Sequence, residues 1–376
     1  MDRSEPLLYD PLFASPPDTV IRDTPGRGFF GKAAVKKALF ILVLLVFVGG
    51  AIAVSFSSLS QDRLEYAEAP GGAMLSAFRA GPDDAVLIVD TAGEDAGALA
   101  GQPVTAVRQF AVCGNEVTVF ILIGKHTVEL PNTAFYDCAA LAAVLVDPEN
   151  PALASVDGVL YRKENGRLTE LVLYPRKNAL YRAALSLGWP APAEETAAAA
   201  FAARLAVWEK NTGVWETVRR GEDVAETDTL PAPEAAAVAD ALRYEIPEGV
   251  TRVGEMAFAE CPGLYAVSFP ATVTEIGQMA FFKCGSLREA PLTDTVAVLG
   301  PDAFSYCVKF TSVFIPAGVT EIGHHAFYGC KGVKSVYVAK SEAEAPLLGQ
   351  DWVPKSRRLF EHNVPVVFGA ERGDAS

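Results

Sequence analysis

The stretch Ile246–Phe269, IPEGVTRVGEMAFAECPGLYAVSF, contains the pattern on which the C-terminal part of the chain is built. An Ala-Phe pair followed three residues later by cysteine returns with a constant 23-residue period, at Ala257-Phe258…Cys261, Ala280-Phe281…Cys284, Ala303-Phe304…Cys307 and Ala326-Phe327…Cys330. A glycine repeats in the same register, at Gly254, Gly277, Gly300 and Gly323. Several columns in register at one period indicate an internal structural repeat.

A second pattern follows each cysteine, with apolar residues at the third, sixth and eighth positions after it. These are Leu264, Val267 and Phe269; Leu287, Ala290 and Leu292; Phe310, Val313 and Ile315; and Val333, Val336 and Val338. This L-x-x-L-x-L spacing is typical of leucine-rich repeats, whose usual period is about 20–29 residues. We therefore expect an α+β repeat solenoid in which each coil supplies one short strand, stacked at ~4.8 Å. Side chains at the sixth and eighth positions should point inward, and those at the fifth and seventh should face outward.

An earlier copy of the pattern begins at Ala134-Phe135…Cys138, with Leu141, Val144 and Val146 at the same offsets. Cys113, with Val119 and Ile121 six and eight residues later, predicts a degenerate copy before it. On this interpretation all six cysteines stand in the repeat column as buried thiols. A disulfide pair is the alternative, because coils ~4.8 Å apart do not forbid bridging. The absence of a C-x-x-C spacing argues against a zinc site made of cysteines.

The motif I-P-x-x-V-T-x-I-G-x-x-A-F-x-x-C-x-x-L resembles the BspA-like subfamily of leucine-rich repeats. It runs here from Ile246 to Leu264 and, more fully, from Phe269 to Leu287. Residues 150–175 resemble an insertion common in that family and predict a β-hairpin that turns at Asn165-Gly166. The resemblance covers residues 104–180 and 246–340, and it implies a surface protein that binds proteins of a host or a neighbouring cell. Thr293 replaces the usual proline, so we expect an irregularity in that copy.

Residues 38–56, ALFILVLLVFVGGAIAVSF, form an uncharged run that could cross a bilayer as a helix of ~28 Å. Five cations and one acid precede the run between Ile21 and Lys37, whereas acids prevail just after it. The positive-inside rule then predicts a disordered cytoplasmic tail at 1–37, a transmembrane signal-anchor at 38–56, and a repeat domain outside the cell. Cleavage of a signal peptide after Ala53 is the alternative.

The other boundaries follow from composition. We expect a linker and capping segment at 57–103 with one strand at 85–89, N-terminal repeats with the hairpin at 104–181, and C-terminal repeats at 246–340. The Ala-rich residues 182–245 predict a helical insertion, with one helix from Glu194 to about Lys210 and another at 234–243. Its stripe of Phe201, Leu205 and Trp208 should dock on the solenoid. Residues 341–376 predict a C-terminal cap, with a strand at 364–368 and a loose tail after Gly369.

Composition and motifs narrow the classes of function. Of 376 residues, half are hydrophobic and only 21% are charged, which excludes a chain disordered throughout. A net charge of −14 argues against nucleic-acid binding. No catalytic or nucleotide-binding motif is present, so we expect no enzyme, no cofactor and no metal. His324-His325 falls in a variable surface turn and should be solvated.

Protein binding through the outward sheet face is the function that this pattern favours. Phe314 and Tyr337 are one coil apart and should lie ~5 Å from each other, as an aromatic anchor. We take Phe314, Tyr337, Glu289 and Leu145 as the candidate site, with an extracellular or cell-surface protein as the partner. Two alternatives remain: another segment covers these residues, or the protein is a non-catalytic part of a membrane assembly whose cytoplasmic tail binds the partner.

Overall fold

The computed structural model describes residues 64–222, 224, 230–344 and 364–375. The chain divides into two compact units, residues 1–55 and 56–376, and every described residue belongs to the second. The expected cytoplasmic tail and transmembrane helix at 1–56 therefore lie outside the described residues. Among the residues described, no helix is both long and apolar enough to span a membrane.

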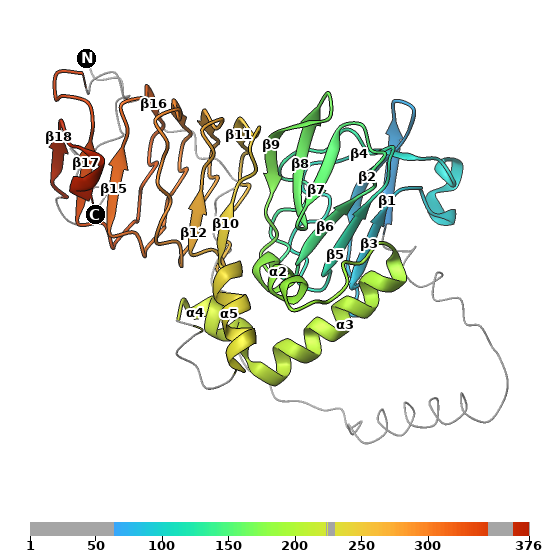
Figure 1. Cartoon of the computed structure of the whole chain (residues 1–376). Helices are drawn as coiled ribbons and strands as arrows, with labels where there is room; N and C mark the ends of the chain where they lie inside the picture. The colour runs from blue at the N-terminus through green and yellow to red at the C-terminus, as the bar shows by residue number, and fades with distance from the viewer. Residues whose placement is uncertain (1–63, 223, 225–229, 345–363, 376) are drawn as a thin grey trace, which may run out of the picture. The chain divides into compact units, whose positions relative to one another are not determined.

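The C-terminal repeats form stacked coils whose short parallel strands lie side by side (Figure 1). One row is β11 (Arg252–Val253), β13 (Glu275–Ile276), β14 (Val298–Leu299) and β16 (Glu321–Ile322). A second row is β10 (Arg243–Glu245), β12 (Ala266–Ser268), β15 (Ser312–Ile315), β17 (Ser335–Val338) and the predicted C-terminal strand, β18 (Val366–Phe368). Val253 pairs with Ile276 and Ile276 with Leu299, which confirms the 23-residue register. In β15 and β17 the inward residues are buried and the outward ones half-buried, which confirms the alternation.

A ladder of aromatic rings forms the core of these coils. The rings of Phe258, Phe281, Phe304 and Phe327 stack at successive centroid distances of 4.7, 4.8 and 5.4 Å. Tyr174 extends the ladder at its first end, 5.0 Å from Phe258. All four rings are buried, and those of Phe258, Phe281 and Phe304 each lie between two stacked neighbours, so a coil buries its phenylalanine against the coils next to it.

The repeated cysteines form hydrogen bonds between the same coils. The thiols of Cys284, Cys307 and Cys330 donate to the carbonyl oxygens of Phe258, Phe281 and Phe304 in the preceding coil, at 2.9, 3.2 and 3.0 Å. Cys138 and Cys261 are placed alike, with the carbonyls of Val112 and Tyr174 as acceptors. These five cysteines are buried and free, as expected, so each thiol satisfies a buried backbone acceptor.

Cys113 does not belong to the column, and the prediction for it was wrong. It is exposed, whereas Asn115 is buried at the position one repeat period before Cys138. The side-chain oxygen of Asn115 accepts hydrogen bonds from the backbone N–H groups of Val117 and Thr118, both at 2.9 Å. The strand register supports the same assignment, because Ile121, six residues after Asn115, pairs with Val144, six residues after Cys138. The repeat before Cys138 therefore has asparagine in the place of cysteine.

The hairpin predicted at Asn165-Gly166 is confirmed. Strands β8 (Val159–Glu164) and β9 (Arg167–Leu173) pair antiparallel, and φ is +52° at Asn165 and +77° at Gly166, as a two-residue primed turn requires. A third strand, β7 (Leu153–Val156), pairs with β8. Because β9 also pairs in parallel with β11, the hairpin joins the N-terminal repeats to the C-terminal ones.

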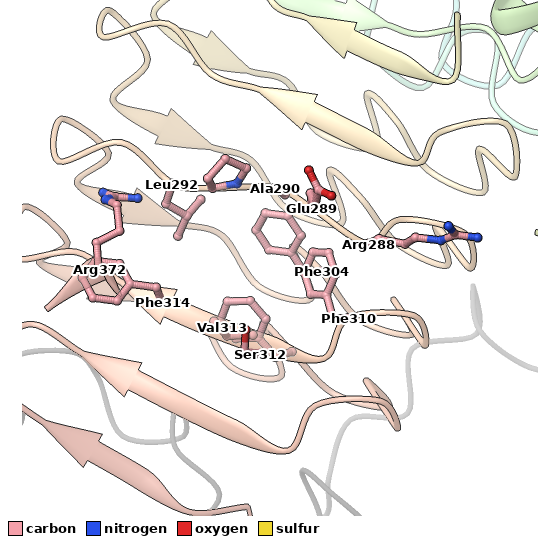
Figure 2. A pocket seen from close by; sticks show the side chains of 12 residues that line it. Arg288, Glu289, Ala290, Leu292, Phe304, Phe310, Ser312, Val313, Phe314 and Arg372 are labelled. Carbon is pink, nitrogen blue, oxygen red and sulfur yellow. The ribbon is translucent and has the colours of Figure 1, made fainter. Parts of the chain in front are cut away.

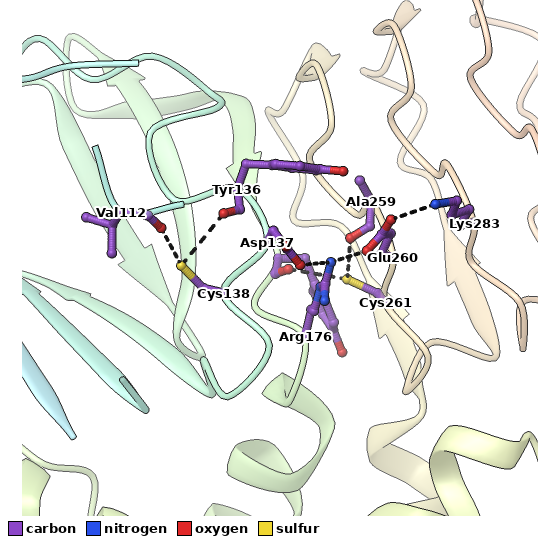
Figure 3. A network of polar contacts seen from close by, with 10 residues as sticks. Val112, Tyr136, Asp137, Cys138, Arg176, Ala259, Glu260, Cys261 and Lys283 are labelled. Carbon is purple, nitrogen blue, oxygen red and sulfur yellow. Dashed lines mark hydrogen bonds and ion pairs between the residues drawn. The ribbon is translucent and has the colours of Figure 1, made fainter. Parts of the chain in front are cut away.

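An ion-pair network reinforces this junction (Figure 3). The guanidinium of Arg176, just after the hairpin, contacts Asp137 of the N-terminal repeats at 2.9 Å and also Glu260 of the C-terminal repeats. Glu260 in turn pairs with Lys283 at 3.1 Å in the next coil. The Arg176 side chain is only 16% exposed, so its charge is held where solvent screens it less than at the surface.

The N-terminal repeats contribute a parallel sheet of β3 (Val86–Val89), β5 (Phe120–Ile123) and β6 (Ala143–Val146). Strand β3 matches the expected strand at 85–89. The segment before it contains more structure than the single strand expected, since β1 (Leu64–Ala69) and β2 (Gly72–Phe78) form an antiparallel pair. Strand β4 (Val104–Val107) joins β2, and a 3₁₀ helix, η4 (Glu94–Leu99), lies between β3 and β4. In β1 the two glutamates, Glu65 and Glu68, are three residues apart, so its apolar and polar residues do not alternate strictly.

The helices in and next to the described part of the insertion are α2 (Asn178–Ser186), α3 (Glu195–Thr212), α4 (Val214–Arg220) and α5 (Ala232–Ala241), and α2 begins before the range 182–245 assigned to the insertion. The two predicted helices correspond to α3 and α5, and β10 already begins inside the range assigned to the insertion. Phe201 and Leu205 of α3 are buried, and the Phe201 ring meets that of Phe120 in β5 at 5.5 Å. Trp208 is half-buried and donates to Glu234 at 2.5 Å. The Phe201 end of the stripe therefore docks on the repeats, as expected, whereas Trp208 packs on Trp189 within the insertion itself.

Replacing Phe281 by alanine should reveal how much the ring ladder stabilises the fold. Its ring stacks on both neighbours and is fully buried, so Phe281→Ala should lower the free energy of unfolding by about 3–5 kcal/mol. Urea unfolding followed by circular dichroism measures this change. Phe282→Ala is the matched control, since Phe282 is only half-buried, and it should cost markedly less. Equal losses for the two variants would contradict a central role for the ladder.

Alkylation should separate Cys113 from the other cysteines. Burial raises the pKa of Cys138 and Cys284 to about 12, so these thiols stay protonated and unreactive. Partial desolvation of its thiol, together with the nearby charge of Asp137, also raises the pKa of Cys113 above its ordinary value. Iodoacetamide should therefore modify one site of the native protein, at a rate that is still climbing near pH 9, because the thiolate fraction grows up to the raised pKa. Mass spectrometry counts the sites. Modification of a second cysteine, or none in wild type, would be inconsistent with this structure.

Candidate functional site

The second row of strands is interrupted at the copy that contains Thr293, where an irregularity was expected. In the described part of the chain, residues 289–292 form no strand: Glu289 makes a single bridge with Ala266, and β15 pairs onward with β17. Pro291 stands at the outward seventh position and has no N–H to donate to the preceding strand. The break is thus explained by Pro291 rather than by Thr293.

A cleft of about 290 Å³ opens at this break (Figure 2). Ala290 stands at the inward sixth position, where the other C-terminal copies have valine, and its smaller side chain leaves space unfilled. The walls are apolar and come mainly from Leu292, Phe304, Phe310, Val313 and Phe327. The cleft therefore reaches the edge of the core of the repeats at one point of the sheet, while these five side chains stay only 1–6% exposed.

Charged side chains surround the mouth of the cleft. Arg288 and Glu289 are exposed on one side, and Arg372 comes from the C-terminal segment on the other. Glu289 pairs with Arg243 at 3.3 Å and Arg372 with Asp294 at 3.2 Å, but these pairs are largely solvated and weak. An apolar centre with a polar rim is the arrangement found at protein interfaces.

Phe314 and Tyr337 are brought together as expected. They are direct partners in the pairing of β15 with β17, and both are half-buried. Phe314 also lines the cleft, and the guanidinium of Arg372 lies 4.9 Å from its ring centroid. Residues 372–375 form a short 3₁₀ helix, η7 (Arg372–Ala375), so this part of the expected loose tail is ordered and covers Phe314 in part.

Leu145 is not part of this surface. It lies in β6, in a different sheet, and packs against the cluster that the helical insertion forms on the N-terminal repeats. Of the four candidate residues, Phe314 and Glu289 line the cleft, Tyr337 lies one strand beyond, and Leu145 is remote from them in the sheet order. Sequence reasoning missed Ala290, Pro291 and Arg372. Ala290 and Pro291 carried a usable signal, because each departs from its own column.

One group of metal-ligand side chains occurs among the described residues. Asp302, His324 and His325 each offer a ligand atom, and these atoms lie within 4.8 Å of one another. Both histidines are exposed, as the sequence suggested, but Asp302 is half-buried beside them. This group is in the turns after the repeat glycines and does not line the cleft.

Comparison with known families agrees with the repeat architecture. A family model described as BspA type leucine rich repeat region matches residues 241–345, with six copies. No curated protein matches the chain.

Solved structures with some likeness are bacterial leucine-rich repeat proteins. A leucine rich cell surface protein from Faecalibacterium prausnitzii is 20% identical, with a TM-score of 0.45, over 80% of this chain and 61% of that one. The pneumococcal vaccine antigen PcpA is 16% identical, with a TM-score of 0.45, over 71% and 46%. A leucine-rich repeat protein from Eubacterium ventriosum is 16% identical, with a TM-score of 0.37, over 68% and 60%. The chain thus spans about half to three-fifths of the length of these proteins.

The family match and the 23-residue register of the coils identify the same stretch of sequence. The chain carries a BspA-type leucine-rich repeat region at residues 241–345.

Proposed function

We propose that this chain is a non-catalytic, membrane-anchored surface protein that binds another protein through the outward sheet face of its C-terminal repeats. The observation that carries the proposal is the apolar cleft at Ala290-Pro291, on the sheet face that also bears Phe314 and Tyr337. The family of the repeats supports protein binding or adhesion as the general role. The uncharged run at 38–56 and its cationic flank support anchoring with the repeats outside the cell.

The chemistry of the cleft suggests how a partner would be held. Phenylalanine and aliphatic side chains line its walls, so an apolar side chain of the partner would gain ~25 cal/mol for each Å² that it buries there. Phe314 and Tyr337 would extend the contact along the sheet, and Arg288, Glu289 and Arg372 would supply polar contacts at the rim. We therefore infer a protein partner that inserts an apolar anchor residue.

The alternative places the partner inside the cell. Residues 1–37 contain the segment LLYDPLF at 7–13, which could act as a linear binding motif of a membrane assembly. Binding through this tail would not depend on the repeats. The cleft, however, has no evident purpose under that alternative, and we favour the repeat face for this reason.

Filling the cleft is the most direct test of the proposed function. Ala290→Val introduces the side chain that stands at the same position in Val267, Val313 and Val336, so it should preserve the fold while closing the cleft. Binding of the full-length protein to a panel of extracellular-matrix and cell-surface proteins, measured by biolayer interferometry, should weaken about tenfold, or ~1.4 kcal/mol. Ala271→Val, an exposed alanine outside the cleft, is the matched control and should bind as wild type does.

A second variant and a competitor make the outcome decisive. Phe314→Ala combined with Tyr337→Ala should cost ~2 kcal/mol of binding if the sheet face is the interface. Binding that survives both this variant and Ala290→Val would reject the site. Binding that a peptide of residues 1–37 abolishes would favour the intracellular alternative instead.

A further inference from the structure

We propose that Asp302, His324 and His325 form a zinc-binding site on the turn surface of the last two complete coils. The three side chains offer two imidazole nitrogens and one carboxylate oxygen, within 4.8 Å of one another. These are ligand types that Zn²⁺ takes readily in proteins, and three protein ligands with an open fourth position form a recurrent zinc arrangement. This inference is independent of the cleft and of the partner proposed for it.

The repeat itself brings the ligands together. Asp302 and His325 occupy the same position in successive coils, one repeat period apart, and the backbone N–H of Asp302 donates to the carbonyl of His324 at 3.0 Å. Both residues have left-handed backbone conformations, with φ of +54° and +59°. Met256 and Met279 have the same conformation in the two coils before them, so this geometry is a property of the coil. Two ligands are therefore held on a rigid backbone at one coil spacing.

Ser305 orients the carboxylate. Ser305 is buried, and its hydroxyl lies 2.7 Å from Oδ1 of Asp302 and 2.7 Å from the carbonyl oxygen of His325, so its one proton is donated to either of these two acceptors at a time. At the equivalent position the neighbouring coils have Phe282 and Tyr328, so this short hydroxyl side chain is specific to this coil. Hydrogen bonds of this kind to a ligating carboxylate fix its orientation and raise metal affinity. When the hydroxyl donates to Oδ1, the second carboxylate oxygen is left for the metal.

The three ligand atoms need to move only a short distance to bind zinc. Tetrahedral zinc with bonds of about 2.1 Å needs ligand atoms ~3.4 Å apart, so the side chains must close by roughly 1 Å. Both imidazoles are exposed and can rotate toward the carboxylate without disturbing the core. The fourth position would then be open to water or to a group from another molecule.

Zinc titration of the full-length protein in detergent, by isothermal calorimetry, tests the site. A Cys113→Ser background removes the exposed thiol as a competing ligand. We expect one saturable zinc per chain, and a dissociation constant that rises more than ~10-fold in Asp302→Asn, His324→Ala and His325→Ala. His126→Ala is the matched control, because His126 is exposed and outside the group, and it should bind as the parent does.

Ser305→Ala provides a second, gentler test because it keeps all three ligands. It should weaken zinc binding by about tenfold while circular dichroism stays unchanged. Three results would overturn the proposal: no saturable binding in the parent, binding that Asp302→Asn and His325→Ala leave intact, or binding that His126→Ala reduces equally. The last two would mean an adventitious ion only.

Discussion

Stacking of one coil on the next is the interaction on which this structure depends. A single coil cannot bury its own phenylalanine, and the ring of Phe281 is buried only because Phe258 and Phe304 lie 4.7 and 4.8 Å from it. The cysteine thiols add a hydrogen bond between coils, each to a backbone carbonyl of the coil before. The first and last coils of such a stack must be covered by other parts of the chain. Tyr174 ends the ladder on one side, and β18 pairs beyond β17 on the other.

The same constraint explains why a change of two side chains opens a cleft. In a regular stack the inward sixth position is filled by valine, and the seventh donates to the strand before it. Ala290 is too small to fill the sixth position, and Pro291 has no N–H group to donate at the seventh. The coils on both sides remain in register, as the pairings of Ile276 with Val253 and with Leu299 show. Structure is therefore lost only in one row of strands, and the other row holds the stack together across the break.

Periodic features were predictable from sequence, and features that arise from single contacts were not. The repeat, the hairpin at Asn165-Gly166 and the docked helix each follow from a spacing or a turn pair. The prediction for Cys113 was wrong because cysteine was used as the marker of the repeat column. Buried Asn115 occupies that position instead and forms side-chain hydrogen bonds there. The position of Arg372 over Phe314 could not be foreseen, since it depends on how a chain end folds back. Sequence thus indicated the face of the candidate site but not its cleft.

The two blocks of repeats differ in what covers their outward sheet faces, and this difference bears on where a partner can bind. On the N-terminal block the insertion packs over the sheet, with Phe201 against Phe120 and with Leu145 in the same cluster. Part of that face is used for internal packing, and a cleft of about 450 Å³ lined by Ile88, Leu122 and Leu145 lies on the rest of it. On β15 and β17 the outward residues are only half-buried, and among the described residues the ring contact to Phe314 from outside the sheet is that of Arg372. An exposed guanidinium over a ring can be displaced at little cost, because its pair with Asp294 is solvated. A protein partner could therefore reach Phe314 on the C-terminal face by displacing the side chain of Arg372.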